Sequence, residues 1–330
     1  MDYFLAVTVP FIIIMIFGPF LIRVLKKCNF GQQIRGQGPK SHQVKKGIPT
    51  MGGILIIFAI LITSFLLLEI NQYIIWTLIV TVGMGLIGFI DDMIKIQTQR
   101  SLGLKARYKI TGQIILGFLL AYYVFIIKGD TIVLPFLGQV SIGFWLIPLV
   151  VFTVIGTANA VNLTDGLDGL AAGVTAIVIS SFYVIAYYNK LHYQPYEPYE
   201  QLSLFGLIVA GACIGFIWYN THPAQVFMGD VGSLALGGAI SALAVFTGTE
   251  IFLLIIGGVF VIETVSVIIQ VIYFKVTGGN RVFKMTPLHH HFELEGLEEN
   301  KIVIRFLILS LLFAAIGLLI FYYTENGFMV

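Results

Sequence analysis

About ten long apolar runs, separated by short polar segments, follow one another along this sequence. A membrane-spanning helix needs about 20 mainly apolar residues. Charged residues make up 11% of the chain, whereas soluble domains carry about 25%. We therefore predict an all-α polytopic membrane protein with about ten transmembrane helices, forming one integral-membrane domain over residues 1–330. The runs lie near residues 4–25, 52–70, 74–92, 108–127, 144–162, 170–188, 202–219, 234–248, 251–274 and 302–323.

The basic residues are distributed unevenly over the polar segments. All of the 19 lysines and arginines except Lys128 and Lys190 lie in segments 23–50, 93–109, 163–169, 220–233 and 275–305. These segments share one side of the membrane if every run crosses it, and the excess of positive charge places that side in the cytoplasm. Both termini are then expected on the extracellular side.

Three acidic clusters fall on the expected cytoplasmic side. Asp91 and Asp92 stand at the end of the third run. Asp165 and Asp168 lie in the asparagine-rich segment 159–170, and Asp230 lies in the glycine-rich segment 227–233. Carboxylates at a bilayer edge are costly unless they meet water, a cation or a donor. Because Mg²⁺ prefers oxygen ligands and bridges carboxylates to phosphates, the clusters predict phosphoryl-transfer chemistry in a cytoplasmic-side cleft.

Each cluster also has a purely structural interpretation. Asp91 and Asp92 could simply end a helix in solvent, although the helix dipole disfavours acids there and makes a cationic partner such as Lys95 more favourable. Asp168 and Asp230 could each be the N-cap of the helix that follows. A cap alone leaves the other polar residues of both segments without a role.

Three consecutive histidines, residues 289–291, form another polar cluster. They cannot all face one ion from a regular helix, and no cysteine or spaced histidine completes a tetrahedral zinc site. Beside Arg281 and Lys284 they suit hydrogen bonds to phosphate or sugar oxygens better. Glu263 lies inside the ninth run, so it is expected to face the bundle or to be protonated. Gln270, two turns further along, is expected to line the same cleft.

Together, these motifs resemble the polyprenyl-phosphate hexose-1-phosphate transferases over essentially the whole chain. The similarity lies in residues 45–53 (KKGIPTMGG), 88–92 (GFIDD), 103–109 (GLKARYK), 159–169 (NAVNLTDGLDG), 228–233 (MGDVGS) and 287–293 (PLHHHFE). The aspartate motifs resemble the superfamily broadly. The histidine motif resembles the muramoyl-pentapeptide branch, in contrast to transferases that use UDP-N-acetylglucosamine.

The resemblance implies ten transmembrane helices, often paired as a homodimer, in the bacterial plasma membrane. It implies a Mg²⁺-dependent cytoplasmic site that joins undecaprenyl phosphate to UDP-N-acetylmuramoyl-pentapeptide, which forms lipid I for peptidoglycan synthesis and releases UMP. The expected partners are these two substrates and membrane lipid, with no nucleic acid.

Carried over by position, the resemblance makes Asp230 the Mg²⁺ ligand and makes Asp91 and Asp92 candidates for the base that takes the proton of the lipid phosphate. His289 is the remaining catalytic candidate. A covalent route with an aspartate nucleophile stays open. The substrate-binding candidates are Lys45, Thr50, Lys95, Lys109, Asn162, Asp165, Asp168, Asn220, Phe227, Gln270, His290 and His291.

Two other classes of protein compete with this interpretation. A transporter would place its acids near the bilayer midplane between related repeats, whereas here they cluster at one boundary and no repeat is evident. A structural or lipid-binding protein accounts for the basic segments but not for the cytoplasmic aspartates. The nearer rival is a sister transferase with another UDP-sugar, against which only the histidine run argues.

Overall fold

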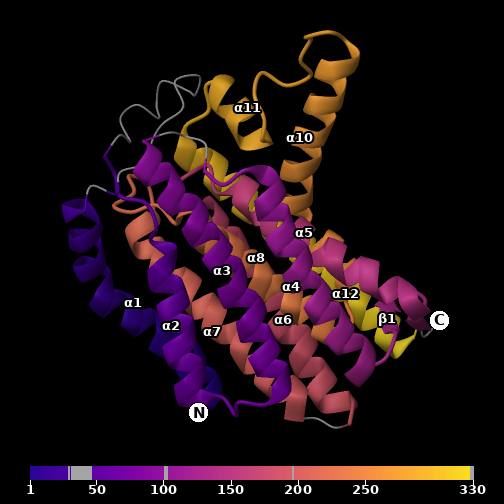
Figure 1. Cartoon of the computed structure of the whole chain (residues 1–330). Coiled ribbons are helices and arrows are strands. Elements are labelled where there is room, and N and C mark those ends of the chain that lie inside the picture. Colours follow the sequence, from indigo (N-terminus) through magenta and orange to yellow (C-terminus); the bar gives the residue numbers. More distant parts are fainter. Residues whose placement is uncertain (29, 31–46, 100–102, 195–196, 328–330) are drawn as a thin grey trace.

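The computed structural model describes residues 1–28, 30, 47–99, 103–194 and 197–327 as a bundle of helices (Figure 1). A short antiparallel hairpin of β1 (Thr131–Leu134) and β2 (Gly138–Ser141) stands between α4 and α5. The helices are α1 (Asp2–Lys27), α2 (Gly53–Leu67), α3 (Gln72–Thr98), α4 (Ala106–Ile127), α5 (Leu146–Thr164), α6 (Leu170–His192), α7 (Glu197–Asn220), α8 (Gly229–Thr247), α9 (Glu250–Ile256), α10 (Gly258–Val276), α11 (Leu288–Leu294) and α12 (Glu299–Asn326), with a 3-10 turn η2 (Gly143–Trp145) before α5.

The prediction of a polytopic all-α membrane protein is confirmed. Within the described part of the chain, nine helices are long and apolar enough to cross a membrane, and α2 matches the second run with a shorter helix of 15 residues.

Two expected boundaries are wrong. The ninth run, expected as one helix over 251–274, is divided at Gly257 into α9 and α10. Glycine is a poor helix former, and a β-carbon at the next residue, Gly258, would lie 2.6 Å from the Phe313 ring of α12. The third run does not end at Asp92, because α3 continues to Thr98. Asp91 and Asp92 therefore lie inside a helix and are buried, not at a solvated helix end.

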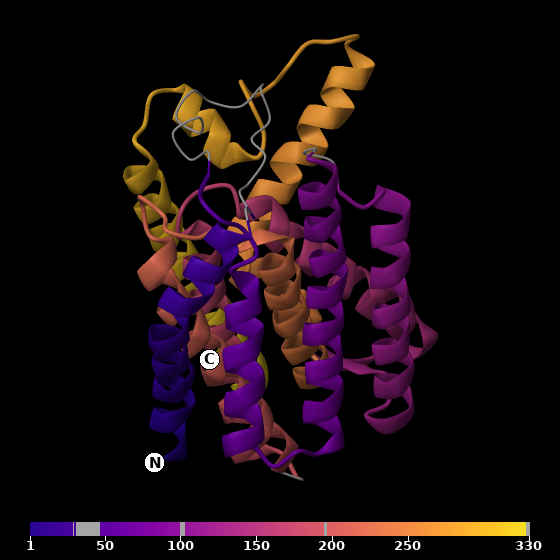
Figure 2. The same cartoon turned by 60° about the vertical axis from the view of Figure 1, so that its left-hand side comes forward.

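The polar segments gather at the two ends of the bundle as the alternation predicts. At one end Lys190 donates to the Tyr3 hydroxyl, and the backbone N–H of Phe136 donates to Thr324. At the other end the backbone N–H of Phe227 donates to the carbonyl of Pro49. Figure 2 shows the N-terminus at the lower end, with α11 and the far end of α10 at the upper end. The assignment of the second end to the cytoplasm remains a prediction from charge.

Helix α8 is the centre of the bundle (Figure 1). Every residue from Val231 to Thr247 is buried, and the helix packs against α2, α3, α5 and α6. It is rich in glycine, alanine and serine, which let helix backbones approach closely in a membrane. A β-carbon at Gly53 of α2 would lie 2.1 Å from the backbone nitrogen of Gly232. This close packing fixes the first turn of α8, where Asp230 lies.

Candidate functional site

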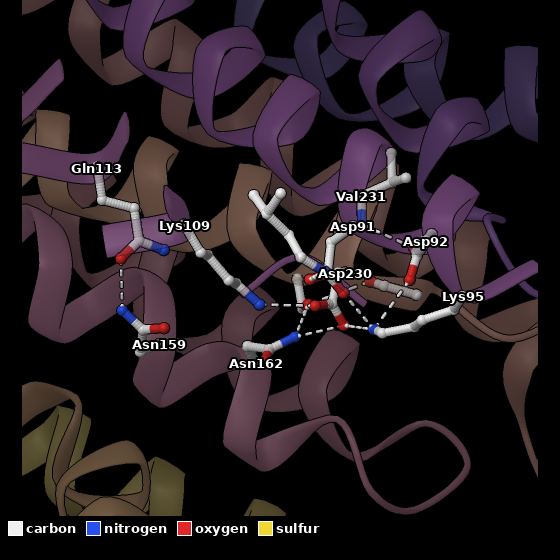
Figure 3. A network of polar contacts seen from close by, with 12 residues as sticks. Asp91, Asp92, Lys95, Lys109, Gln113, Asn159, Asn162, Asp230 and Val231 are labelled. Carbon is white, nitrogen blue, oxygen red and sulfur yellow. Dashed lines mark hydrogen bonds and ion pairs between the residues drawn. The ribbon is translucent and has the colours of Figure 1, made fainter. Parts of the chain in front are cut away.

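Three predicted acids meet at one point, which we call the acid cluster: Asp91 and Asp92 of α3 and Asp230 of α8 (Figure 3). One carboxylate oxygen from each lies within 4.8 Å of the others. Lys95 Nζ is 2.6 Å from Asp91, 3.2 Å from Asp92 and 3.0 Å from Asp230. Lys109 of α4 approaches the other oxygen of Asp230, at 2.6 Å. Residues far apart in sequence thus form one compact charged site.

Backbone amides hold the two aspartates of α3. Leu104 N–H donates to Asp91 Oδ1 at 2.9 Å, and Val231 N–H donates to Asp92 Oδ2 at 3.2 Å. Val231 lies in the first turn of α8, where N–H groups lack helical partners and favour a negative charge. The remaining oxygen of each aspartate faces Lys95. Asp230 is not the N-cap that the structural interpretation suggested, since Met228 occupies that position.

Glycines make room for the acid cluster. A β-carbon at Gly88 would lie 2.1 Å from the Asp230 carbonyl oxygen, and one at Gly103 would lie 2.6 Å from the Asp91 carboxylate. Gly229 has a positive φ of 73° and would place a β-carbon 2.5 Å from Asp92 Oδ2. Any side chain at these positions would move the carboxylates or the helices that carry them.

The asparagine-rich segment borders the acid cluster through Asn162 and Asp165. Asn162 Nδ2 donates to Asp230 Oδ1 at 3.0 Å and to Ser233 Oγ at 2.9 Å. Asp165 follows the last residue of α5. Burial, and then the negative charges of Asp230 and Asp92, raise its pKa to about 8. The Asp165 carboxyl group therefore keeps its proton to a higher pH than an exposed carboxyl group, as expected beside other carboxylates.

Asp168 takes part in a second cluster with His222 and Glu299. Its Oδ2 lies 3.0 Å from His222 Nδ1 and accepts the N–H of Ala224 at 3.1 Å, while its own N–H donates to Glu299 at 2.8 Å. The N-cap interpretation of Asp168 is wrong, because Gly169 occupies the N-cap with a φ of 81°. Nothing in the sequence singled out His222 or Glu299, which lie in other segments.

Asn220 also joins segments. Its Oδ1 accepts the N–H of Gly169 at 3.0 Å, and its Nδ2 donates to the carbonyl of Val226 at 2.9 Å. The side-chain amide thus connects the turn before α6 to the loop before α8. A role in substrate binding for Asn220 and Asp168 stays a prediction.

The three histidines lie on α11 and face different partners. His289 is fully buried and lies 3.2 Å from Glu263 of α10. His290 pairs with Glu293 at 2.7 Å, and His291 Nδ1 accepts the N–H of Lys284 at 3.3 Å. This division agrees with the argument that they cannot share one ion. Glu263 faces the bundle, as predicted.

The remaining candidates surround these groups. Phe227 pairs through its backbone with Pro49 and with Gly52, each at 2.8 Å, while the Thr50 hydroxyl lies beside Gly229. The Gln270 amide binds the backbone of Val282 and Phe283, so it orders the chain before α11. A role for Gln270 in lining the cleft stays a prediction. Lys45 lies outside the described residues.

Comparisons with known proteins agree with the motifs. Residues 73–248 match the family model described as Glycosyl transferase family 4, and residues 45–57 match phospho-N-acetylmuramoyl-pentapeptide-transferase signature 1. The phospho-N-acetylmuramoyl-pentapeptide-transferase of Oceanobacillus iheyensis is 49% identical over 324 residues, which cover 96% of this chain and 97% of that protein. The protein of the same name from Bacillus licheniformis is 47% identical over 96% of this chain and 96% of that protein. The one from Desulforamulus reducens is 47% identical over 97% of this chain and 96% of that protein.

These matches cover both the acid cluster and nearly all of the helices around it. They confirm the resemblance that the six sequence motifs indicated. The chain therefore belongs to the phospho-N-acetylmuramoyl-pentapeptide-transferase family, and it is a multi-pass membrane transferase of bacterial peptidoglycan synthesis.

Proposed function

We propose that this chain transfers phospho-N-acetylmuramoyl-pentapeptide from its UDP conjugate to undecaprenyl phosphate, which forms lipid I and releases UMP. The observation that carries the proposal is the acid cluster with Lys95 and Lys109 beside it, at the same end of the bundle as the histidine motif. Both substrates are phosphate anions, which lysines attract and bind. The relatives carry this donor sugar in their names.

Mg²⁺ is the cofactor that the acid cluster fits. The donor set consists of carboxylates only, and their oxygens lie near enough to share one small hard cation. Asp230 would be its main ligand, with Asp91 and Asp92 beside it. When bound, Mg²⁺ supplies neutralisation of charge on phosphate oxygens.

The Asp91–Asp92 pair is the proposed proton acceptor for the lipid phosphate. Backbone amides fix one oxygen of each aspartate, which leaves the other oxygen of each, beside Lys95, for exchange with a substrate. On the donor side, Asn162 and Asp165 flank the acid cluster and are proposed to contact the sugar nucleotide. A covalent aspartyl intermediate is the alternative, and it predicts a burst of UMP from enzyme and donor without any lipid acceptor.

The test is UMP release by purified protein with Mg²⁺, undecaprenyl phosphate and either UDP-N-acetylmuramoyl-pentapeptide or UDP-N-acetylglucosamine. We expect release with the muramoyl substrate alone, and none after chelation of divalent cations. Release with the glucosamine substrate alone would replace the proposed donor with that of a sister transferase.

Homodimer formation is proposed as well, and the mass of the protein in a lipid nanodisc measures it.

A further inference from the structure

A buried glutamate–histidine pair joins α10 to α11. Glu263 Oε2 of α10 and His289 Nδ1 of α11 are 3.2 Å apart, and neither side chain exposes any surface. Among the described residues, none of the four polar atoms of these side chains makes a hydrogen bond. Burying an acid–base pair with no further partners usually brings no net stability, because the cost of desolvating its polar groups offsets their attraction. The pair therefore calls for an explanation other than stability.

The other edge of the His289 ring faces the turn between α5 and α6. A β-carbon at Gly166 would lie 2.1 Å from His289 Nε2. Gly166 does not have a positive φ, so space, and not backbone conformation, demands glycine here. The imidazole thus packs directly on the backbone of the residue that follows Asp165.

The turn is otherwise anchored mainly at its far end. Asp168 is held there by His222, Ala224 and Glu299. At the near end, the N–H groups of Asp165 and Gly166 reach only carbonyls of the preceding turn of α5. Contact with His289 joins this end of the turn to α11, and His289 in turn contacts Glu263 of α10.

We propose that Glu263 is a positioning residue: it fixes the His289 ring against Gly166 and so holds Asp165 in place beside the acid cluster for binding of the sugar nucleotide. The ring can rotate about its bond to the β-carbon, and the contact of Glu263 with Nδ1 selects the orientation that aims Nε2 at Gly166. The effect on the donor rests on the proposed function. The effect on the turn does not.

The test compares Glu263→Gln with Glu250→Gln, a matched control. Glu250 is also a buried glutamate, but it begins α9 next to the hairpin, at the opposite end of the bundle. Hydrogen exchange is measured first, on ligand-free protein. We expect amides 165–167 to exchange at least tenfold faster in Glu263→Gln and at the wild-type rate in Glu250→Gln. Unchanged exchange in Glu263→Gln would overturn the proposal.

Kinetics give a second readout that a merely structural role would not produce. The KM for the UDP substrate should rise about tenfold in Glu263→Gln while kcat stays within threefold, and Glu263→Asp should recover part of the change because it keeps the charge. Gly166→Ala perturbs the same contact. In the double variant Gly166→Ala/Glu263→Gln, the rise in KM should be smaller than the product of the rises in the two single variants. In Gly166→Ala/Glu250→Gln, the rise in KM should equal the product of the two single effects. If the effects of Gly166→Ala and Glu263→Gln on KM simply multiply, the proposal is also overturned.

Two outcomes need separate treatment. If Glu263→Gln does not fold, His289→Asn replaces it in the exchange measurement because it removes the ring from Gly166. Amides 165–167 are expected to exchange faster than in wild type, and an unchanged rate would refute the idea. If the wild-type protein releases no UMP with any donor, the proposed function fails, while the exchange comparison still decides whether Glu263 holds the turn.

Discussion

Replacing Gly88 with alanine should disable the acid cluster without changing any of its polar side chains. Gly88 lies on α3, one turn before Asp92. A β-carbon there would lie 2.1 Å from the Asp230 carbonyl oxygen and 2.6 Å from Val231 N. Ordinary contacts of this kind begin near 3.4 Å, so α3 and α8 must separate locally by 3.4 − 2.1 = 1.3 Å. Because the obstructing atoms are backbone, no side-chain rotation can relieve the clash.

The expected magnitude follows from that displacement. A shift of about 1 Å in catalytic groups can cost about 100-fold in rate, which corresponds to about 2.7 kcal/mol of transition-state stabilisation. Overpacking also lowers the free energy of unfolding by about 1–3 kcal/mol. We therefore expect Gly88→Ala to reduce kcat/KM about 100-fold while the protein still folds and melts a few degrees lower.

Gly83→Ala is the control, because it adds the same methyl group to the same helix. Its β-carbon would meet the terminal methyl groups of Leu116 at 2.9 and 3.0 Å, and a leucine side chain can rotate away. The assay is the initial rate of UMP release with saturating Mg²⁺, together with the melting temperature of each variant. Retention of more than a third of kcat/KM in Gly88→Ala would refute the reasoning, and so would equal losses in both variants.

Three further changes test other parts of the site. Asp230→Asn should abolish Mg²⁺-dependent turnover, and Mg²⁺ should raise the melting temperature of the wild type but not of this variant. Near-normal UMP release would exclude Asp230 as the metal ligand. Asp165 has its pKa raised from 3.8 to about 8 in the folded state, so the folded protein keeps a proton that the unfolded chain loses. The free energy of unfolding of the wild type should therefore fall, relative to Asp165→Asn, as the pH rises from about 4 to about 8, and parallel pH curves from denaturation would contradict this. Glu299→Gln weakens a charge-assisted contact that holds Asp168 and His222. The loss of about 1.5 kcal/mol should raise the KM for the UDP substrate about tenfold. A lower melting temperature without a change in KM would show that Glu299 contributes to stability alone.

The meeting of the acids could be predicted from sequence because a membrane leaves few choices. Hydropathy fixes how often the chain crosses, and each polar segment then falls at one of two ends. Asp91 and Asp230 are 139 positions apart, yet they had to lie at the same end of the bundle, and they form one cluster. The contacts of Lys95 with Asp91 and Asp92 are local, since they lie one helical turn apart.

The cluster around Asp168 could not be predicted by the same reasoning. Alternation of crossings assigns His222 and Glu299 to the correct end but does not say which segments touch there. Their contacts depend on how α6, α7 and α12 pack around α8. A cap was the structural alternative for Asp168 because an acid before an apolar run commonly serves that purpose. In the structure Gly169 is the N-cap of α6, and the Asp168 carboxylate instead accepts the N–H of Ala224 in the loop before α8.

The glycines of the motifs show how packing and chemistry divide within the site. Gly166 lies in the motif of residues 159–169, and the group that approaches its backbone is the His289 ring. Gly88 and Gly229 likewise admit groups of the protein itself, the Asp230 backbone and the Asp92 carboxylate. Glycine in these motifs therefore sets the distance between charged groups, and the acids set what those groups can bind. It follows that a glycine variant and an isosteric acid variant should fail differently: the first should lose rate through displaced groups that still bind a cation, and the second should lose the cation itself.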